Sequence, residues 1–537
     1  MSDTHQHDVE PAGETTGSTT GSTTGESGTR RRGRSRTEGM RNRLPEQLPF
    51  EQPTMRLNHT EVVSADELES IHEASLTILE RIGMEFFCPE ARSIMREAGA
   101  SVDESNGRVR FDRELVLSSV AKAPAEFTLH SWNPAHNLQI GGRWLAYGTV
   151  GSAPHYLDRN GVRKTGDREG YRDLLKLAQS LNTLHFLGGY PVEPVDIHHS
   201  VRHIEAAHDA LTLTDKVLHC YSLGRQRNRD VLEMVRIARG IDTQTLMREP
   251  SVFSVVNTNS PLRLDTPMSQ GMIEFAHHNQ PIVVTPFTLA GAMAPITLAG
   301  ALAQQNAEAL GGVTFLQNIN PGTPVVYGGF TSNVDMQSGA PAFGTPEYVR
   351  TAMIGGQLAR RYSLPYRSSN VSASNALDAQ AAYESVFSLW GCVMGGVNFM
   401  MHGAGWMEGG LHASLEKMIL DADLLQMVTK MMEPVVVDDA AFAIDTIESV
   451  GPGGHFFGTK HTQDRFRDAF YKPLLSDWRN YESWQEAGSP EVPDRAKALV
   501  TRFLDAYEPP VMDSAIRAEL DAFVATRVGE GGVATDF

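Results

Sequence analysis

The stretch from Val397 to Gly410 reads Val-Asn-Phe-Met-Met-His-Gly-Ala-Gly-Trp-Met-Glu-Gly-Gly, an apolar run that stops at His402 and continues as a glycine-rich loop. The run is too short for a helix and lies between two long helical patterns, so it predicts a buried strand. His402, Trp406 and Glu408 then follow the carboxyl end of that strand. Parallel sheets build their sites at this edge, so we expect the chemistry of the chain here.

Seven similar apolar segments precede this one, and each is followed by a helical pattern. They start near Trp144, Thr183, Lys216, Ser251, Pro281, Pro324 and Pro365. The eight starts are about 36 residues apart on average, which is the size of the strand and helix unit of a closed barrel. The predicted fold is therefore α/β, a (β/α)8 TIM barrel over residues 141–432. An open, doubly wound parallel sheet is the alternative.

Three further parts flank the predicted barrel. Residues 1–45 carry Gly-Ser-Thr-Thr repeats and an arginine cluster without periodic apolar residues, a composition typical of a disordered arm. Residues 46–140 predict a mixed α/β N-terminal segment, whose first helix begins with a capping box from Ser64 to Glu67 and ends at Gly83. Residues 433–537 predict a mostly helical C-terminal extension, with helical segments at Asp477–Ala487 and Pro493–Ala506.

The composition excludes several classes of protein. Acidic residues outnumber basic residues 65 to 47, which argues against a nucleic-acid-binding surface. The three cysteines Cys88, Cys220 and Cys392 lie far apart, so we expect neither a disulfide framework nor a cysteine zinc site. No apolar run approaches the roughly 18 residues that a membrane span needs, and no apolar segment follows the arginine cluster as it would in an export signal. We expect a cytoplasmic protein with no nucleic-acid or membrane partner.

Side chains that follow the eight strands are expected to line one pocket. They are Tyr190 and Glu193, Tyr221 and Ser222, Asn257, Asn259 and Ser260, Phe287, Phe330 and Asp335, Ser368, Ser369 and Asn370, and His402, Trp406 and Glu408. The set holds no lysine in strand register, no histidine pair at metal spacing and no paired carboxylates. Aromatic walls with few charges suit a small cation held by ring quadrupoles, above all a quaternary ammonium ion.

Each of these residues also has a structural interpretation. Aromatic side chains dominate buried area in any protein, so each ring could belong to the core instead. His402 could be a core histidine, but its position between a strand and a Gly-Ala-Gly loop favours the pocket. His198, His199 and His203 cluster without a neighbouring carboxylate or cysteine, so we expect no metal bound directly by the chain.

Several stretches between Phe50 and the C-terminus resemble a known family. They are Asn133–Pro134 with Ile140–Gly142, Leu213–Lys216, Tyr221–Arg225, Asp335–Met336 with Gly344–Glu347, Asp378–Gln380 with Glu384, His402–Gly410, and Gly451–His455 with His461–Thr462. On these stretches the chain resembles the trimethylamine methyltransferase (MttB-type) superfamily of corrinoid-dependent methyltransferases. The resemblance implies an eight-fold βα barrel. It also implies transfer of a methyl group from a small methylated amine to the cobalt of a corrinoid (cobalamin) held by a separate small protein.

Two departures from the family pattern narrow this expectation. The archaeal trimethylamine enzymes carry pyrrolysine, whereas every position here is a standard residue, including residues 372–381. The chain therefore resembles the subgroup without pyrrolysine, similar to glycine betaine methyltransferase. Corrinoid-carrying modules show an Asp-x-His-x-x-Gly motif, and the nearest string, Asp196–Val201, lacks its glycine. We therefore expect the corrinoid to come from a partner protein.

The expected substrate is a quaternary amine such as glycine betaine. Its nitrogen leaves as a neutral amine when Co(I) attacks a methyl group, so the protein need only position that group and exclude water. We interpret His402 as the catalytic residue that faces the cobalt. The hypothetical substrate site consists of Tyr190, Phe330 and Trp406 as a cage, Asn257 and Asn259 beside a carboxylate, and Tyr221, Phe287 and Glu408.

Other functions remain open at this stage. The same barrel could demethylate trimethylamine or another methylamine, or act as a lyase on a small acid. It could also be a binding protein for quaternary amines without catalytic activity. The oligomeric state is left open, and a homo-oligomer is possible.

Overall fold

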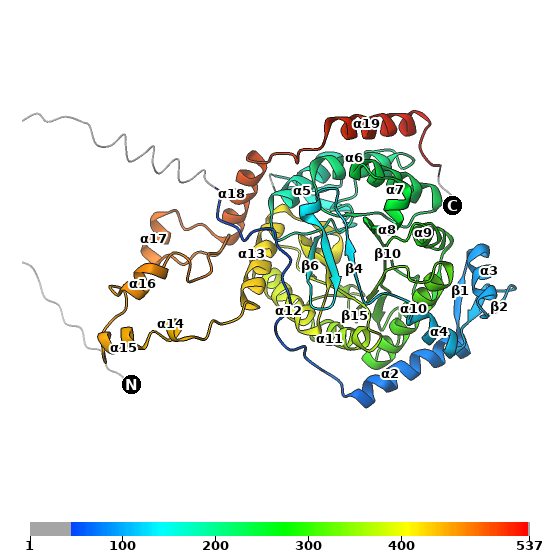
Figure 1. Cartoon of the computed structure of the whole chain (residues 1–537), viewed down its shortest axis with the longest axis horizontal. Coiled ribbons are helices and arrows are strands. Elements are labelled where there is room, and N and C mark those ends of the chain that lie inside the picture. The colour runs from blue at the N-terminus through cyan, green and yellow to red at the C-terminus, as the bar shows by residue number, and fades with distance from the viewer. Residues whose placement is uncertain (1–43, 160, 535–537) are drawn as a thin grey trace, which may run out of the picture. The chain divides into compact units, whose positions relative to one another are not determined.

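The computed structural model describes residues 44–159 and 161–534, and a parallel sheet lies at its centre (Figure 1). The predicted arm at residues 1–45 therefore lies almost entirely outside the described residues. In spatial order the sheet contains β6 (Ala146–Thr149), β18 (Phe399–Ala404), β17 (Tyr366–Ser369), β14 (Val325–Gly328), β12 (Ile282–Val284), β10 (Val252–Val256) and β9 (Leu218–His219). Every neighbouring pair is parallel. The predicted α/β class and parallel sheet are confirmed, and each of these strands begins close to its predicted start.

The strand predicted near Thr183 is reduced to isolated residue pairs. Phe186 pairs in parallel with Gly148 of β6 on one side and with Val217, beside β9, on the other. Phe186 thus lies between the two edge strands of the sheet. Close packing explains the glycine, because a Cβ on Gly148 would lie 2.2 Å from the Phe186 ring. Here the structure differs from the prediction, with seven regular strands and one minimal strand.

Helices follow the strands along the chain and cover the outside of the sheet (Figure 1). They are α5 (Arg168–Ser180), α6 (Arg202–Leu213), α7 (Arg225–Arg239), α8 (Thr243–Arg248), α9 (Thr266–His277), α10 (Leu298–Ile319), α11 (Pro346–Arg361), α12 (Ala379–Gly395) and α13 (Leu415–Met431). The opposite face of the sheet carries a buried aromatic core, in which Phe186 stacks on Phe399 with 4.0 Å between ring centroids. The antiparallel hairpin of β4 (Glu126–Leu129) and β5 (Leu138–Gly141) adds apolar side chains to the same core.

The N-terminal segment begins as its sequence predicts. Ser64 and Glu67 form the predicted capping box at the start of α2 (Ala65–Thr77), and a π-helical turn (Ile78–Ile82) extends this helix to Gly83. Gly83 has φ of 75°, and a Cβ there would lie 2.2 Å from the Val109 carbonyl oxygen. The helix therefore ends where only glycine fits. The segment continues with β1 (Met84–Phe86), α3 (Pro89–Glu97), β2 (Ser101–Asp103), β3 (Arg108–Arg110), α4 (Arg113–Val120) and a 3₁₀ turn (Pro134–His136).

The C-terminal part is helical but irregular. It contains α14 (Asp439–Phe442), α15 (Ile444–Val450), α16 (Lys460–Arg465), α17 (Tyr481–Glu486), α18 (Val492–Asp505) and α19 (Ser514–Gly529). The helix expected at Pro493–Ala506 is present as α18. The one expected from Asp477 starts later, because the Asn480 side chain caps α17 by accepting from the Ser483 N–H. The boundaries at 140/141 and 432/433 stay predictions.

Short strands complete the fold around the ends of the sheet. They are β7 (His155–Leu157), β8 (Arg163–Thr165), β11 (Arg263–Leu264), β13 (Phe287–Ala290), β15 (Phe330–Val334), β16 (Pro341–Ala342), β19 (Trp406–Met407) and β20 (His412–Ala413), with a 3₁₀ turn at Glu408–Gly410. Within the described residues, no helix has both the length and the apolar composition that crossing a membrane requires.

Candidate functional site

A cavity of about 310 Å³ opens at the carboxyl end of the parallel strands. Of the residues predicted to meet there, it brings together Tyr221, Ser222, Asn257, Phe287, Phe330, His402 and Trp406. Residues that the sequence reasoning missed complete its wall, notably Ser152, His219, Phe343 and Arg367. No aspartate or glutamate is among the described residues that line it. A cavity of this size, with mostly apolar walls and a few polar groups, has the character of a small-molecule site.

One wall of the cavity is aromatic. Phe287 and Phe330 occupy matching positions on the parallel strands β13 and β15, and their ring centroids lie 5.1 Å apart. Phe343 stacks on Phe330 at 5.6 Å, and Trp406 meets Phe330 edge to face at 6.1 Å. These packed rings hold one another in place, so the wall is formed before any ligand binds.

His402 lies within β18 in a strained backbone conformation. Its φ is 54°, in the left-handed region that favours glycine, at a place where the pairing of β18 with β6 is irregular. The imidazole lies 4.1 Å from the Trp406 ring and is 7% exposed. Burial, with smaller contributions from Arg367 and His219, lowers the pKa of His402 well below 6.5. The ring is therefore neutral at pH 7, and its buried Nδ1 has no hydrogen-bond partner among the described residues.

Arg367 is the least expected member of the cavity wall. It lies inside β17 and is 2% exposed, and its side chain makes no hydrogen bond or ion pair with any described residue. Its guanidinium carbon lies 4.9 Å from the centre of the Phe330 ring. Burial lowers the pKa of Arg367 to about 10, so the side chain is still cationic at pH 7. The sequence does show an arginine within an apolar strand segment. The prediction considered only residues that follow the strands, so it did not include Arg367.

The opposite wall is polar and internally bonded. The Tyr221 hydroxyl accepts from the Tyr190 N–H at 3.0 Å and shares a hydrogen bond with the Ser152 hydroxyl at 2.8 Å. His219 Nε2 accepts from the Val255 N–H at 3.1 Å, which places the proton of a neutral ring on Nδ1. Burial lowers the pKa of His219 to about 3, so this second imidazole is also neutral.

Three of the predicted substrate-binding residues, Tyr190, Asn259 and Glu408, do not line the cavity. The Tyr190 ring packs against Tyr221 with 4.7 Å between centroids and borders a separate, smaller space. Asn259 donates to the Asp265 carboxylate at 3.1 Å, and Glu408 pairs with Arg163 at 2.8 Å. The other strand-end residues outside the cavity are Glu193, Ser260, Asp335, Ser368, Ser369 and Asn370. Position after a strand predicts the edge of the sheet but not the direction of a side chain within a loop.

The loops at the edge of the cavity are bonded to one another. The Glu384 carboxylate accepts from the Ser372 hydroxyl at 2.8 Å and from the backbone N–H groups of Ala373 and Ser374 at 2.8 and 3.1 Å. The backbone of Glu408 donates to the Ser374 carbonyl at 2.9 Å, and that of Gly409 donates to the Ser372 carbonyl at 3.0 Å. A single buried carboxylate thus holds residues 372–374, and these residues hold the loop of Glu408 and Gly409 through backbone hydrogen bonds.

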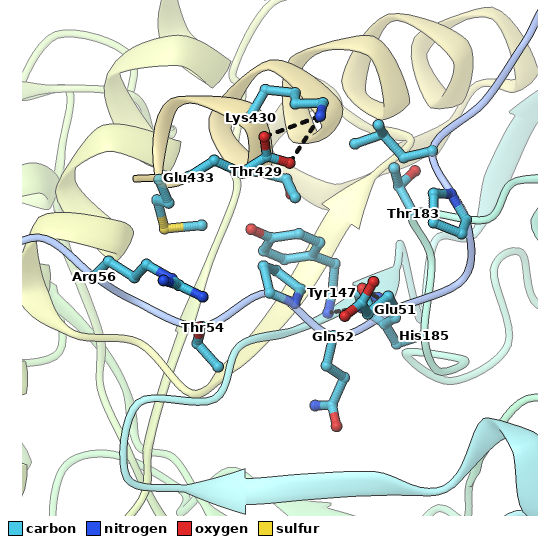
Figure 2. A pocket seen from close by; sticks show the side chains of 14 residues that line it. Glu51, Gln52, Thr54, Arg56, Tyr147, Thr183, His185, Thr429, Lys430 and Glu433 are labelled. Atoms are coloured by element: carbon cyan, nitrogen blue, oxygen red, sulfur yellow. Dashed lines mark hydrogen bonds and ion pairs between the residues drawn. The ribbon is translucent and has the colours of Figure 1, made fainter. Parts of the chain in front are cut away.

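A second cavity of about 340 Å³ lies near the amino ends of the strands (Figure 2). Figure 2 shows the side chains of Arg56 and Tyr147 pointing into it, with Lys430 and Glu433 bonded to each other at its edge. The segment that covers it reaches the sheet just before β6, where the Leu145 N–H donates to the Pro53 carbonyl. Parallel sheets carry their reactive groups at the other end, so the aromatic cavity is the candidate site.

The histidine cluster does not form a metal site in the described residues. His203 Nε2 bonds to Asp230 at 2.9 Å, whereas the His198 and His199 rings contact each other at a tilt. Only Glu69, His72 and Glu73 lie at ligand spacing in the described part of the chain. Their side chains already bond to Arg361, Tyr362 and Arg113, respectively. We assign no metal to them.

The chain is similar to known methyltransferases over most of its length. The sequence model of the family described as trimethylamine methyltransferase (MTTB) matches residues 29–532. A protein named glycine betaine methyltransferase, from Desulfitobacterium hafniense, is 36% identical over 88% of this chain and 98% of its own length. Trimethylamine methyltransferase MttB2 of Methanosarcina mazei is 28% identical over 86% of this chain and 94% of its own. The crystal structure of the Methanosarcina barkeri monomethylamine methyltransferase is similar at 10% identity with a TM-score of 0.44, over 86% of this chain and 88% of that one. The chain belongs to the trimethylamine methyltransferase (MTTB) family.

Proposed function

We propose that this chain moves a methyl group from a quaternary amine that carries a carboxylate, of the glycine betaine type, to the Co(I) corrinoid of a separate small protein. Family membership supports the reaction class, and the 36% identity to a glycine betaine methyltransferase supports the choice of amine. The observation that carries the proposal is the unpaired cation of Arg367 inside an aromatic cavity.

The charge of Arg367 selects among methylated amines. A buried cation without a partner is costly, so the site favours a ligand that brings an anion to it. Glycine betaine brings a carboxylate, which forms strong, charge-assisted hydrogen bonds with a guanidinium group. Trimethylammonium and choline bring only positive charge, which Arg367 repels. Arg367 therefore takes the role in carboxylate binding for which Asn257 and Asn259 were the candidates.

The aromatic wall suits the other end of such a ligand. A trimethylammonium group forms no N–H hydrogen bonds, and aromatic faces attract it through their quadrupoles. Phe287, Phe330 and Trp406 line the cavity, so the cage uses Phe287 in place of Tyr190. Tyr221 and Asn257 are polar contacts on the remaining wall.

The residues present fit a corrinoid at the mouth of the cavity rather than inside it. About 310 Å³ accommodates one small molecule and leaves no room for a macrocycle. His402 is neutral, and its Nδ1 is free of partners, so it is available to face an incoming corrinoid without adding charge. When bound there, the Co(I) centre supplies the nucleophile that accepts the methyl group.

The chain's own contribution is positioning and desolvation. Arg367, beside Phe330, holds the carboxylate of the amine, and the rings of Phe287 and Trp406 hold its ammonium end, which points one methyl group in a fixed direction. The amine departs neutral, so no side chain needs to donate or remove a proton.

We also propose that Phe186 closes the sheet into the (β/α)8 barrel, which gives the cavity a single mouth. Three buried free cysteines are compatible with a reducing cytoplasm.

The experiment compares ligands and arginine variants. The full chain is titrated calorimetrically with glycine betaine, choline and trimethylamine, and methyl transfer to Co(I) cobalamin is followed by visible absorbance. We expect glycine betaine to bind best, Arg367→Met to weaken it roughly 10- to 100-fold, and Arg367→Lys to keep part of the affinity. Arg360→Met is the matched control, because Arg360 bonds to the Gly395 carbonyl outside the cavity.

Two outcomes would count against the proposal. Tighter binding of trimethylamine or choline than of glycine betaine, unchanged in Arg367→Met, would indicate a substrate without a carboxylate. Tight binding of glycine betaine without any methyl transfer, also in the presence of corrinoid proteins from the same organism, would indicate a binding protein.

A further inference from the structure

Residues 433–472 carry large apolar side chains that no described residue covers. Figure 1 shows this segment, with α14, α15 and α16, leaving the rest of the chain after α13 and returning toward α18. No residue between 433 and 472 is buried. Val435, Phe457 and Phe470 are 85%, 87% and 82% exposed. Val436, Val437, Phe442, Ile444, Ile447, Phe456 and Phe466 are also exposed.

This segment cannot cover its own apolar groups. Its three helices have only a few residues each, and their apolar side chains do not meet in a common core. Contiguous exposed apolar surface on a protein marks a contact with another molecule. Because so many side chains need cover at all times, the contact has the character of a permanent interface.

The charges of the segment are separated along its length. Residues 433–450 hold Glu433, Asp438, Asp439, Asp445 and Glu448 and no lysine or arginine. Residues 451–472 hold Lys460, Arg465, Arg467 and Lys472 against Asp464 and Asp468. One half is therefore acidic and the other is basic. Two such segments complement each other when they run antiparallel.

We propose that residues 433–472 form a dimerisation arm that packs antiparallel against the same arm of a second copy of this chain. A two-fold axis brings residue i of one copy against residue j of the other, and j against i. The acidic half of each arm then faces the basic half of its partner, and the valine and phenylalanine side chains are buried between them. A stable interface takes roughly 20–30 residues from each partner, and the arm offers more than that.

A second copy explains the arm better than the corrinoid protein does. The corrinoid protein is expected at the mouth of the aromatic cavity and must leave after each transfer. An arm that a transient partner covered would be exposed to water between encounters. A second copy is available wherever the chain is made, and it carries the matching charge pattern.

The first test measures the mass of the full chain in solution. Light scattering after gel filtration at micromolar concentration should give twice the chain mass of 58.9 kDa. The double variant Val435→Asp/Phe457→Asp should run as a monomer with an unchanged circular dichroism spectrum. Val511→Asp is the matched control, because Val511 is 94% exposed outside the arm and should leave the dimer intact.

The second test reverses charges. Asp445→Lys/Glu448→Lys should weaken the dimer at least 10-fold, and Arg465→Glu/Arg467→Glu should do the same. Placing all four substitutions in one chain exchanges the signs at these four positions and restores opposite charges between them, so the dimer should recover at least in part. Recovery is expected only if the arms contact each other.

Several results would overturn the proposal. A wild-type monomer at micromolar concentration would do so, as would a dimer that Val435→Asp/Phe457→Asp leaves intact. Failure of the fourfold reversal to recover the dimer, while each double reversal disrupts it, would place the arm against another surface. A monomer whose arm binds the corrinoid protein would assign the arm to that partner.

Discussion

Single residues of the aromatic cavity hold buried polar atoms that no described residue satisfies. The buried Nε1 of Trp406 and Nδ1 of His402 both lack hydrogen-bond partners. Unsatisfied buried groups are costly, and they are retained where a ligand uses them. Together with Arg367 they are polar groups that can orient a ligand within a mostly apolar cavity.

Trp406 should contribute to the binding of the ammonium group. Trp406→Leu removes the indole face and should weaken glycine betaine roughly 10-fold in a calorimetric titration. The analogue 3,3-dimethylbutanoate, in which carbon replaces nitrogen so that the positive charge is lost, should be much less affected. Trp478→Leu is the control, because Trp478 is 71% exposed away from the cavity. Equal losses for the ligand with the ammonium group and for the one without it would assign Trp406 to packing alone.

His402 should act on transfer rather than on binding. We expect His402→Ala to lower the rate of methyl transfer at least 10-fold while the affinity for glycine betaine changes less than about 3-fold. Because its pKa is far below 6.5, His402 stays neutral from pH 6 to pH 8, so transfer should be flat over this range. An acid limb near pH 6.5 that disappears in His402→Ala would contradict the neutral ring.

The residues of the site were only partly predictable. Tyr221, Asn257, Phe287, Phe330 and Trp406 follow strands of the sheet within a few residues, and His402 lies within the last one. The period of strand and helix places such positions together. Arg367 lies within a strand, and its direction depends on how the sheet curves. Phe343 comes from a loop after β16 and reaches the cavity through packing on Phe330. Neither position follows from local sequence.

At the scale of elements, β18 and α13 form the unit that presents His402 and Trp406. The turn after β18 is held by α13, because the Asp421 carboxylate accepts from the Gly405 N–H at 2.8 Å. Asp421 also pairs with Lys417 at 2.5 Å, and both side chains are fully buried. Lys417 further donates to the Ser385 hydroxyl on α12. A buried ion pair on α13 therefore fixes the strand that carries the site.

Breaking this pair should be strongly destabilising. Lys417→Met leaves the buried Asp421 carboxylate without its cation, which should lower the free energy of unfolding by about 3–5 kcal/mol. Arg517→Met is the matched control, because Arg517 and Asp521 form an ion pair with the same i,i+4 spacing at the surface. The control should leave the urea midpoint almost unchanged. Similar urea midpoints for the two variants would show that the buried ion pair contributes no more to stability than the exposed one.

Elements were predicted well where a local pattern determines them. Short apolar runs bounded by proline or glycine located seven strands, and the capping box located α2. The segment near Thr183 has the same pattern but pairs only through Phe186, because its contacts depend on a glycine 38 residues earlier, at Gly148. The late start of α17 has a local cause in the Asn480 cap.

At the scale of the whole molecule, several buried histidines link stability to pH. Burial lowers the pKa of His185 and of His219 to about 3 and that of His412 to about 4. In the unfolded chain these residues titrate near 6.5, so below that pH the unfolded state binds more protons than the folded state. The contribution of these histidines to the free energy of unfolding is therefore complete above pH 6.5, and it is lost as the pH falls toward 3.

Thermal unfolding should reveal this linkage. Between pH 7 and pH 5, His185 and His219 should each reduce the free energy of unfolding by about 2 kcal/mol. His219→Asn should flatten the dependence of the melting temperature on pH in this range. His198→Asn, at an exposed position, should leave the slope as it is. A slope that does not change in His219→Asn would show that this ring is already charged in the folded chain.

The Glu384 network at the rim also has a kinetic meaning. Since one carboxylate holds residues 372–374, which in turn bond to residues 408 and 409, the loop that carries Gly409 is fixed beside the cavity. Substitutions of Glu384 should therefore move this loop and change how fast a ligand is exchanged, although Glu384 itself does not line the cavity.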